Sequence, residues 1–149
     1  VLQTLLEAAM NFENSKMYPG LPEYFDNEGR GLYAYLTGAA SWYMLTMITE
    51  VFGVKGDLGD LVIAPSLLPE QFDEKGSAGL KLEFARKKFE IIMHNPEKKD
   101  LRIEQIRRAV CDEKVVLEPE PEYGVRLRKS VIETLDQKKC HRIDVFFQE

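Results

Sequence analysis

The sequence predicts an α+β chain, with a helical first part at residues 1–54 and a β-rich second part at residues 55–149. Three observations support this division. Apolar residues recur with the spacing of a helix at residues 1–11, and residues 38–52 are apolar nearly all round. Strict alternation of apolar and polar residues, the pattern of half-buried strands, begins around residue 80. The turn-rich segment at residues 55–60 separates the two patterns.

Two helices and a long loop are expected in the first part. Residues 1–11 gather their leucines and alanines on one helical face. Residues 11–36 are rich in Gly, Pro, Asn and aromatic residues and show no clear period, which predicts a long ordered loop. Residues 38–52 are apolar nearly all round, as in a helix that is covered on every side. Gly53 is well placed to end that helix.

Short strands are expected throughout the second part, at residues 61–64, 80–85, 89–94, 101–106, 115–117 and 143–147. The segments 80–85 and 89–94 are expected to be antiparallel neighbours, and a bulge is expected at Gln105. Residues 125–127 fit another strand, although residues 126–135 also fit a helix. Many short strands with turns between them predict a sandwich.

The apolar positions of the most regular strands are expected to fill the core of that sandwich, while the polar positions between them form solvated sheet faces. The residues expected to be mostly buried are Leu80, Leu82, Phe84, Phe89, Ile91, Met93, Ile143, Val145 and Phe147.

One short motif suggests a ligand. Thr37 and Gly38 stand directly before the apolar helix. Thr37 is a favourable N-cap residue, and Gly38 has no side chain to keep a ligand away from the backbone. The free N–H groups at a helix start, together with the positive end of its dipole, form an anion site. A core helix with an N-cap that binds nothing has the same pattern, so both interpretations stay open.

This motif belongs to a longer ordered series of sequence blocks. The blocks are YPGLPEYF at residues 18–25, EGRG at 28–31, YAYLTGAASW at 33–42, TEVFGV at 49–54, GDLV at 59–62, AP at 64–65 and LPEQFD at 68–73. The series resembles glycoside hydrolase family 94, which contains the cellobiose, cellodextrin, laminaribiose, chitobiose and β-1,2-oligoglucan phosphorylases. The resemblance covers about residues 12–96, and the rest of the chain more loosely.

The resemblance implies the last helices of an (α/α)6 barrel, followed by a C-terminal antiparallel β-sandwich of jelly-roll type. It implies an inverting phosphorylase, which cleaves a β-linked disaccharide or oligosaccharide with inorganic phosphate and releases an α-sugar 1-phosphate. It places phosphate contacts on Thr37 and Gly38. The family's catalytic aspartate lies upstream of the segment that this chain resembles, so no catalytic residue is assigned here. Phosphate is a co-substrate, and no cofactor is expected.

The resemblance also implies an upstream barrel polypeptide as partner and a homo-oligomer for the full enzyme. Val1 stands inside a helical pattern with no cap before it, so we expect the chain to be cut from something longer. The sugar and its linkage are left open.

Several side chains near the motif have two interpretations. Five aromatic residues either line a sugar site or pin the long loop to the core: Tyr18, Tyr24, Phe25, Tyr33 and Tyr35. Four carboxylates are interpreted as structural, because none lies in the motif that carries the family's acid: Glu23, Asp26, Glu28 and Glu50. Glu28 is expected to pair with Arg30.

Composition argues against several classes of function. The chain has 149 residues, a net charge of −5, 44% hydrophobic and 30% charged residues, as in an ordinary globular domain. The absence of a basic cluster argues against nucleic acid as the main partner. No apolar run is long enough to cross a bilayer. With no signal-peptide pattern, a cytoplasmic location is expected.

Neither the cysteines nor the histidines form a recognisable site. Cys111 and Cys140 are expected to be reduced thiols, although a bond between them stays open. His94 and His141 lack the spacing of metal ligands, so no metal site is expected. The alternative to an enzyme part is a non-catalytic β-sandwich module for interaction or structure. The Thr37–Gly38 motif favours the enzyme, because such a module would not need it.

Overall fold

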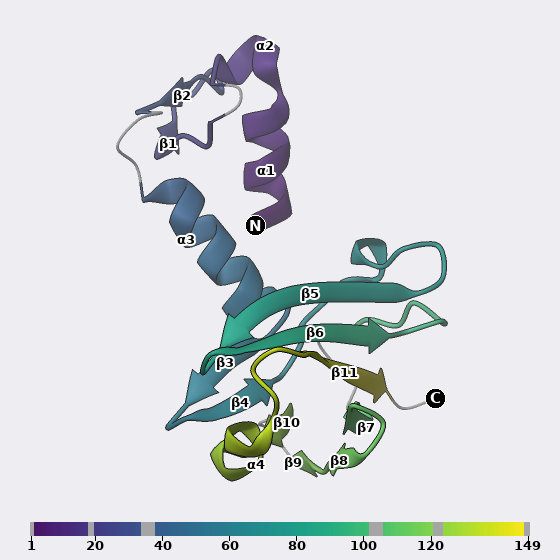
Figure 1. Ribbon diagram of the computed structural model, residues 1–149. Coiled ribbons are helices and arrows are strands. Elements are labelled where there is room, and N and C mark those ends of the chain that lie inside the picture. Colours follow the sequence, from purple (N-terminus) through teal and green to yellow (C-terminus); the bar gives the residue numbers. More distant parts are fainter. Residues whose placement is uncertain (1, 18–19, 34–37, 102–105, 121–123, 148–149) are drawn as a thin grey trace. The chain divides into compact units, whose positions relative to one another are not determined.

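The computed structural model describes residues 2–17, 20–33, 38–101, 106–120 and 124–147. The chain divides into two compact units, Val1–Met47 and Ile48–Glu149. The first unit contains helices and a two-stranded ribbon, and the second contains two larger sheets (Figure 1). The chain is therefore of mixed α+β class, with most of its regular structure in sheets.

The elements of the first unit are α1 (Leu2–Met10), α2 (Phe12–Ser15), β1 (Tyr24–Phe25), β2 (Gly31–Leu32) and α3 (Ala39–Thr46). α1 confirms the helix expected from its apolar face. α2 forms because the side chain of Asn11 accepts a hydrogen bond from the N–H of Asn14 at 3.4 Å. β1 and β2 pair antiparallel. Both features lie in the segment that was predicted as a long loop, which is therefore more regular than its composition suggested.

The apolar helix predicted over residues 38–52 changes character along its length. It is an α-helix only over Ala39–Thr46, and Met47–Val51 continue as a π-helical turn. Gly53 follows with φ of +65°, which confirms its expected role in ending the helix. The side chains of Val51 and Phe52 pack against the core of the second unit.

The first sheet of the second unit has the strand order β3-β4-β10-β9. Its strands are β3 (Val54–Asp57), β4 (Asp60–Ile63), β9 (Pro119–Glu120) and β10 (Gly124–Leu127), and neighbours pair antiparallel. β4 confirms the strand expected there. β3 was missed, because its sequence VKGD resembles a turn more than a strand.

The second sheet has the strand order β5-β6-β11-β7-β8. Its strands are β5 (Ser77–Phe84), β6 (Lys87–His94), β7 (Ile106–Cys111), β8 (Val115–Leu117) and β11 (Cys140–Phe147). The predicted antiparallel pairing of β5 with β6 is confirmed. β11 lies between β6 and β7, antiparallel to β7 but parallel to β6. The expectation of a purely antiparallel sandwich was therefore wrong for that pair, since period-2 alternation is the same in both strand directions.

The connections differ from the prediction in two places. Of the strand expected at residues 101–106, Leu101 is buried in a turn and Ile106 is the first residue of β7, while residues 102–105 lie outside the described residues. Gln105, where a bulge was expected, lies outside the described residues. Both interpretations of the segment after residue 124 hold in turn, because β10 ends at Leu127 and a short helix, α4 (Lys129–Thr134), follows. A 3-10 turn at Pro69–Gln71 lies in the connection expected to be irregular.

The two larger sheets contribute to one hydrophobic core, an arrangement compatible with a β-sandwich. Of the residues expected to be mostly buried, six are buried: Phe89, Ile91, Met93, Ile143, Val145 and Phe147. Leu80, Leu82 and Phe84 are half-buried against the core, because β5 is the edge strand of its sheet. Among the helices of the described residues, none is both long and apolar enough to cross a membrane.

Candidate phosphate-binding site

The start of α3 carries the part of the predicted phosphate motif that the structure describes. Gly38 occupies the N-cap position, and its carbonyl oxygen accepts a hydrogen bond from the N–H of Trp42 at 2.7 Å. Having no side chain, Gly38 supplies no cap to the N–H groups of the first turn. Those groups are the donors that the phosphate hypothesis uses.

Thr37 lies outside the described residues, so its contact with phosphate stays a prediction. Its expected role as the N-cap residue is corrected, because the helix begins at Ala39 and the N-cap is Gly38. Glycine is also tolerated at this position, so the two residues of the motif were equally eligible by sequence.

Space, rather than backbone conformation, is what Gly38 provides. Its φ of −74° and ψ of −12° are open to any residue. A Cβ atom built on Gly38 would lie 2.9 Å from Cδ1 of Trp42, closer than carbon atoms normally approach. Trp42 is 68% exposed.

The aromatic residues that were candidates for a sugar site are only partly described. Tyr24 and Tyr33 form an exposed pair, with ring centroids 5.5 Å apart and an angle of 43° between the rings. Desolvation and the neighbouring Tyr33 raise the pKa of Tyr24 above its ordinary value. Tyr18 and Tyr35 lie outside the described residues. The structure therefore brings together two of the five candidates.

One of the carboxylates near the motif, Asp26, bonds to the local backbone. Oδ1 of Asp26 accepts hydrogen bonds from the N–H groups of Glu28 and Arg30, each at 2.9 Å, and so shapes the turn between β1 and β2. The expected ion pair of Glu28 with Arg30 is not formed between these two described residues. The prediction was wrong because Asp26, two residues before Glu28, organises the turn through the backbone instead.

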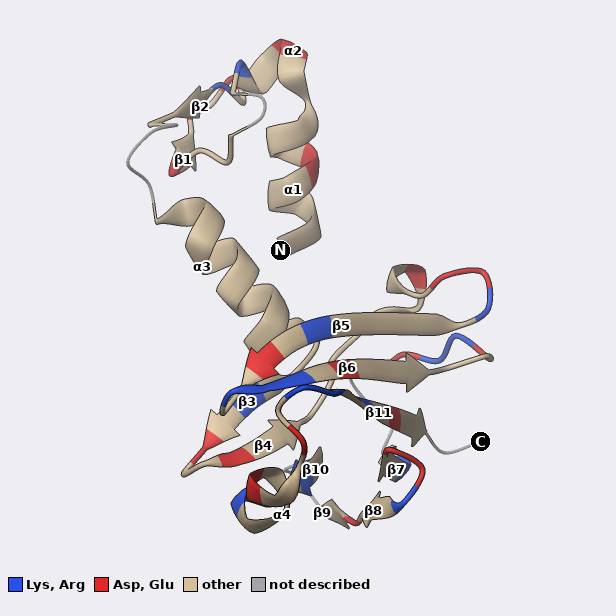
Figure 2. Ribbon diagram, in the orientation of Figure 1, with Lys and Arg blue, Asp and Glu red and all other residues tan. Residues whose placement is uncertain are grey.

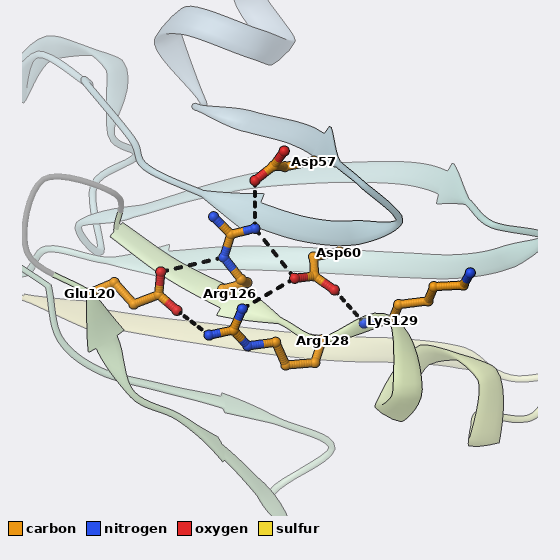
Figure 3. Close-up of polar contacts among 6 residues, drawn as sticks. All are labelled: Asp57, Asp60, Glu120, Arg126, Arg128 and Lys129. Atoms are coloured by element: carbon orange, nitrogen blue, oxygen red, sulfur yellow. Dashed lines mark hydrogen bonds and ion pairs between the residues drawn. The ribbon is translucent and has the colours of Figure 1, made fainter.

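A larger polar cluster, which the sequence analysis did not single out, lies at one end of the first sheet (Figure 3). It consists of Asp57, Asp60, Glu120, Arg126, Arg128 and Lys129. Arg126 lies 2.7 Å from Asp57 and 3.3 Å from Asp60, and Arg128 lies 2.7 Å from Glu120. The acids and arginines compensate one another, so the cluster connects strands instead of offering charge to a ligand.

Asp60 also caps α4 from a distant strand. Its Oδ1 accepts a hydrogen bond from the N–H of Lys129 at 2.7 Å. That bond, with those from Arg126 and Arg128, outweighs desolvation and holds the pKa of Asp60 below its ordinary value. Asp60 thus provides α4 with the N-cap that its own Arg128 does not supply.

His141 is buried in a second polar connection. Its Nδ1 lies 2.7 Å from Asp112, and its Nε2 lies 2.8 Å from the carbonyl oxygen of Asp136. Both ring nitrogens therefore face oxygen atoms. Burial raises the pKa of Asp112, but hydrogen bonds from His141, the N–H of Arg142 and Lys139 lower it to about 2. The group ties the β7–β8 turn to the start of β11.

The cysteines and the possible metal ligands of the described residues form no recognisable reactive site. Cys111 and Cys140 are both free thiols, and burial raises the pKa of Cys111 to about 11, which makes its thiolate scarce. Within the described ranges, no group of three or more His, Cys, Asp or Glu side chains is placed to hold a metal ion.

No protein-family model matches this chain, and no curated protein matches it. The resemblance to family 94 therefore stays a prediction from the ordered sequence blocks at residues 18–73.

Proposed function

We propose that this chain is the C-terminal part of an inverting disaccharide or oligosaccharide phosphorylase. In this proposal the first unit belongs to the last helices of an (α/α)6 barrel, and the second unit is the terminal sandwich of jelly-roll type. The chain supplies one wall of the phosphate site through Thr37 and Gly38. The observation that carries the proposal is the ordered series of family-94-like blocks across residues 18–73.

The character of α3 supports a place inside a larger helical assembly. None of its eight residues, all of them described, is buried. Trp42, Met44 and Leu45 are 68%, 60% and 48% exposed. A helix that is apolar nearly all round normally lies in the interior of a large protein. Other helices of a barrel would provide that cover.

Phosphorolysis requires only donors for the phosphate group from the Thr37–Gly38 segment. An inverting glycosidase needs an acid and a base that activates water. Phosphate is itself a nucleophile, so one carboxylic acid suffices to protonate the leaving oxygen, and the rest of the site must stabilise a dianion. Backbone N–H groups at the start of α3 and the Thr37 hydroxyl are donors of the required kind.

The proposal is tested with Thr37→Ala and Gly38→Val in the complete enzyme. Losing one hydrogen bond to a charged group costs about 1.5–3 kcal/mol, so kcat/KM for phosphate should fall about ten- to hundred-fold. Gly38→Val should be as harmful, because its side chain would fill the space beside Trp42. KM for the disaccharide should change much less in both variants.

Thr46→Ala is the matched control. Thr46 Oγ1 donates to the carbonyl oxygen of Trp42 within the same helix, at 2.8 Å, so its loss tests general damage to α3. Normal phosphate kinetics in all three variants would refute the phosphate site. Equal losses in all three would show a structural effect and would also count against it.

A non-catalytic β-sandwich module is the alternative function. The observation in its favour is that the second unit has an extensive hydrophobic core of its own. Complete enzyme without phosphorolysis of any β-linked glucose or N-acetylglucosamine disaccharide would favour this alternative.

A further inference from the structure

A cavity of about 570 Å³ opens in the second unit at the end of the five-stranded sheet. Its volume lies within the range of small-molecule sites. Figure 2 shows basic and acidic residues together in the loop that leads into β5 and in the loop after β6, at the same end of this sheet. The lining residues used below are Lys75, His94, Lys99, Arg107, Arg108 and Phe146.

A bulge in the sheet directs two consecutive arginines to this cavity. Phe146 of β11 pairs with Arg108, but the next residue, Phe147, pairs with Ile106. Arg107 is therefore the extra residue of β7. In a regular strand, neighbouring side chains point to opposite faces, whereas a bulge redirects one of them. Both Arg107 and Arg108 are exposed and line the cavity.

An aromatic surface lies beside the arginines. The rings of His94 and Phe146 stack with centroids 4.8 Å apart and 10° between their planes. Nε2 of His94 lies 2.6 Å from Asp144, and Arg142 binds both oxygens of Asp144 at 2.8 Å. These contacts fix the orientation of the stacked pair, so the surface is formed before any ligand arrives.

Hydrogen bonds and close packing hold together the two loops that carry Lys75 and Lys99. The side chain of Asn95 is buried and bonds to both the N–H and the carbonyl oxygen of Lys99, at 3.0 Å and 2.8 Å. Gly76, with φ of +71°, packs so closely that a Cβ atom there would overlap the carbonyl oxygen of Asn95. The loops carrying Lys75 and Lys99 are thereby fixed against each other.

Two basic side chains that line the cavity, those of Lys75 and Arg108, have no ion-pair partner among the described residues. Lys99, which also lines it, pairs with Glu97 at 3.1 Å.

We propose that this cavity binds the phosphate group of a small molecule. Arg108 and Lys75 supply donors for the phosphate oxygens, and a dianion suits several cations better than a single one. The stacked surface of Phe146 packs against the ring or carbon skeleton of a phosphate ester. The site is separate in sequence from the Gly38 motif and does not depend on the proposed phosphorylase activity.

Isothermal titration of the 149-residue chain tests the proposal, with inorganic phosphate, glucose 6-phosphate and glucose as the three probes. Phosphate or its ester should bind, while uncharged glucose should not. Tighter binding of the ester would show that the skeleton contributes, and equal binding would identify free phosphate as the ligand. Failure of both phosphates to bind would refute the site.

Variants then locate the binding. Arg108→Gln and Lys75→Gln should each weaken it about ten-fold or more, as expected for a lost hydrogen bond to a charged group. Lys138→Gln, which removes an exposed lysine outside the cavity, should leave it unchanged. Equal weakening by Lys138→Gln would reveal non-specific charge attraction and overturn the proposal.

Hydrogen exchange distinguishes this site from the one at α3. The ligand should protect residues 94–99 and 106–111 from exchange, and the Gly38→Val variant should bind as tightly as wild type. Protection limited to residues 38–47, with binding lost in Gly38→Val, would refute the cavity site while supporting the proposed function. Protection of the cavity residues alone would support the cavity site, and the proposed phosphorylase function would then be tested separately.

Discussion

Gly53 shows how strongly single residues determine this fold. It stands between the π-helical turn and β3, and its φ of +65° lies in the left-handed region. A Cβ atom there would overlap the carbonyl oxygen of Ala64, whose own N–H donates to the Gly53 carbonyl at 2.9 Å. The sequence predicted a glycine that ends a helix, but the close approach of Ala64 depends on the sheet and could not be predicted from the local pattern.

Gly53→Ala should therefore lower the free energy of unfolding of the second unit by about 1–3 kcal/mol or more. Gly79→Ala is the matched control, because Gly79 has no positive φ and its nearest contact would be an ordinary 3.6 Å from the carbonyl oxygen of Ile91. It should change stability by about 0.5 kcal/mol or less. Urea denaturation compares the two, and equal effects would contradict the strain at Gly53.

Asp112 should make stability depend on pH in the acid range. Its pKa is about 2 in the folded chain, below the ordinary 3.8. The unfolded chain therefore takes up a proton first as pH falls, so the contribution of Asp112 is complete above about pH 4 and is lost toward pH 2. Acid denaturation curves should show this loss.

Asp112→Asn should flatten the acid dependence and also lower stability at neutral pH, since His141 loses its carboxylate partner. Glu113→Gln, an exposed neighbour, should retain the wild-type acid dependence. If the acid denaturation curve of Asp112→Asn matches that of the wild type, the carboxylate of Asp112 is not the cause of the acid dependence.

At the scale of elements, alternation identified strands better than it identified their partners. β5, β6, β8 and β11 lie close to where the pattern predicted them. β3 was not predicted, because its sequence contains a glycine and charged residues. Leu101, which was expected to begin the next strand, is buried in a turn. The parallel pairing of β11 with β6 follows from the connection between β6 and β7, which leaves a place between them.

The β5–β6 hairpin can be stabilised at its turn. Ala85 and Arg86 form a two-residue loop with φ of 49° and 62°, the left-handed pattern of a type I′ turn. Asn and Gly adopt this conformation at lower cost than Ala and Arg. Ala85→Asn with Arg86→Gly should raise the free energy of unfolding by about 1 kcal/mol. As a control, the reversed pair, Ala85→Gly with Arg86→Asn, should raise the free energy of unfolding by less. A lower free energy of unfolding for the Asn-Gly pair would contradict the type I′ turn.

For the whole molecule, apolar exposure is concentrated in the first unit. Most of the exposed large hydrophobic side chains among the described residues precede residue 48, including Met10, Phe12, Trp42, Met44 and Leu45. A contiguous exposed apolar surface normally marks an interaction site or an aggregation risk. Residues 38–52 are apolar nearly all round, and none of the residues of α3 is buried.

The isolated chain should therefore self-associate through residues 1–54. Light scattering should report a mass above that of one chain, and Trp42→Gln with Leu45→Gln should shift it toward the monomer. Val116→Gln, at an exposed apolar position of the second unit, should leave the association unchanged. A monodisperse wild-type monomer would contradict this prediction.

The central claim is that this chain forms only part of a phosphorylase active site and that an upstream polypeptide forms the rest. One assay tests it most directly. The 149-residue chain is incubated with phosphate and a panel of β-linked glucose and N-acetylglucosamine disaccharides, alone and joined to the upstream barrel polypeptide, and sugar 1-phosphate is measured. Under the proposed function, the acid, which typically contributes about 10²–10⁴-fold, and the other phosphate donors belong to the upstream polypeptide. We predict no release by the chain alone and release by the joined polypeptide. Release at enzymatic rates by the isolated chain, or none by the joined polypeptide on any disaccharide, would contradict the claim.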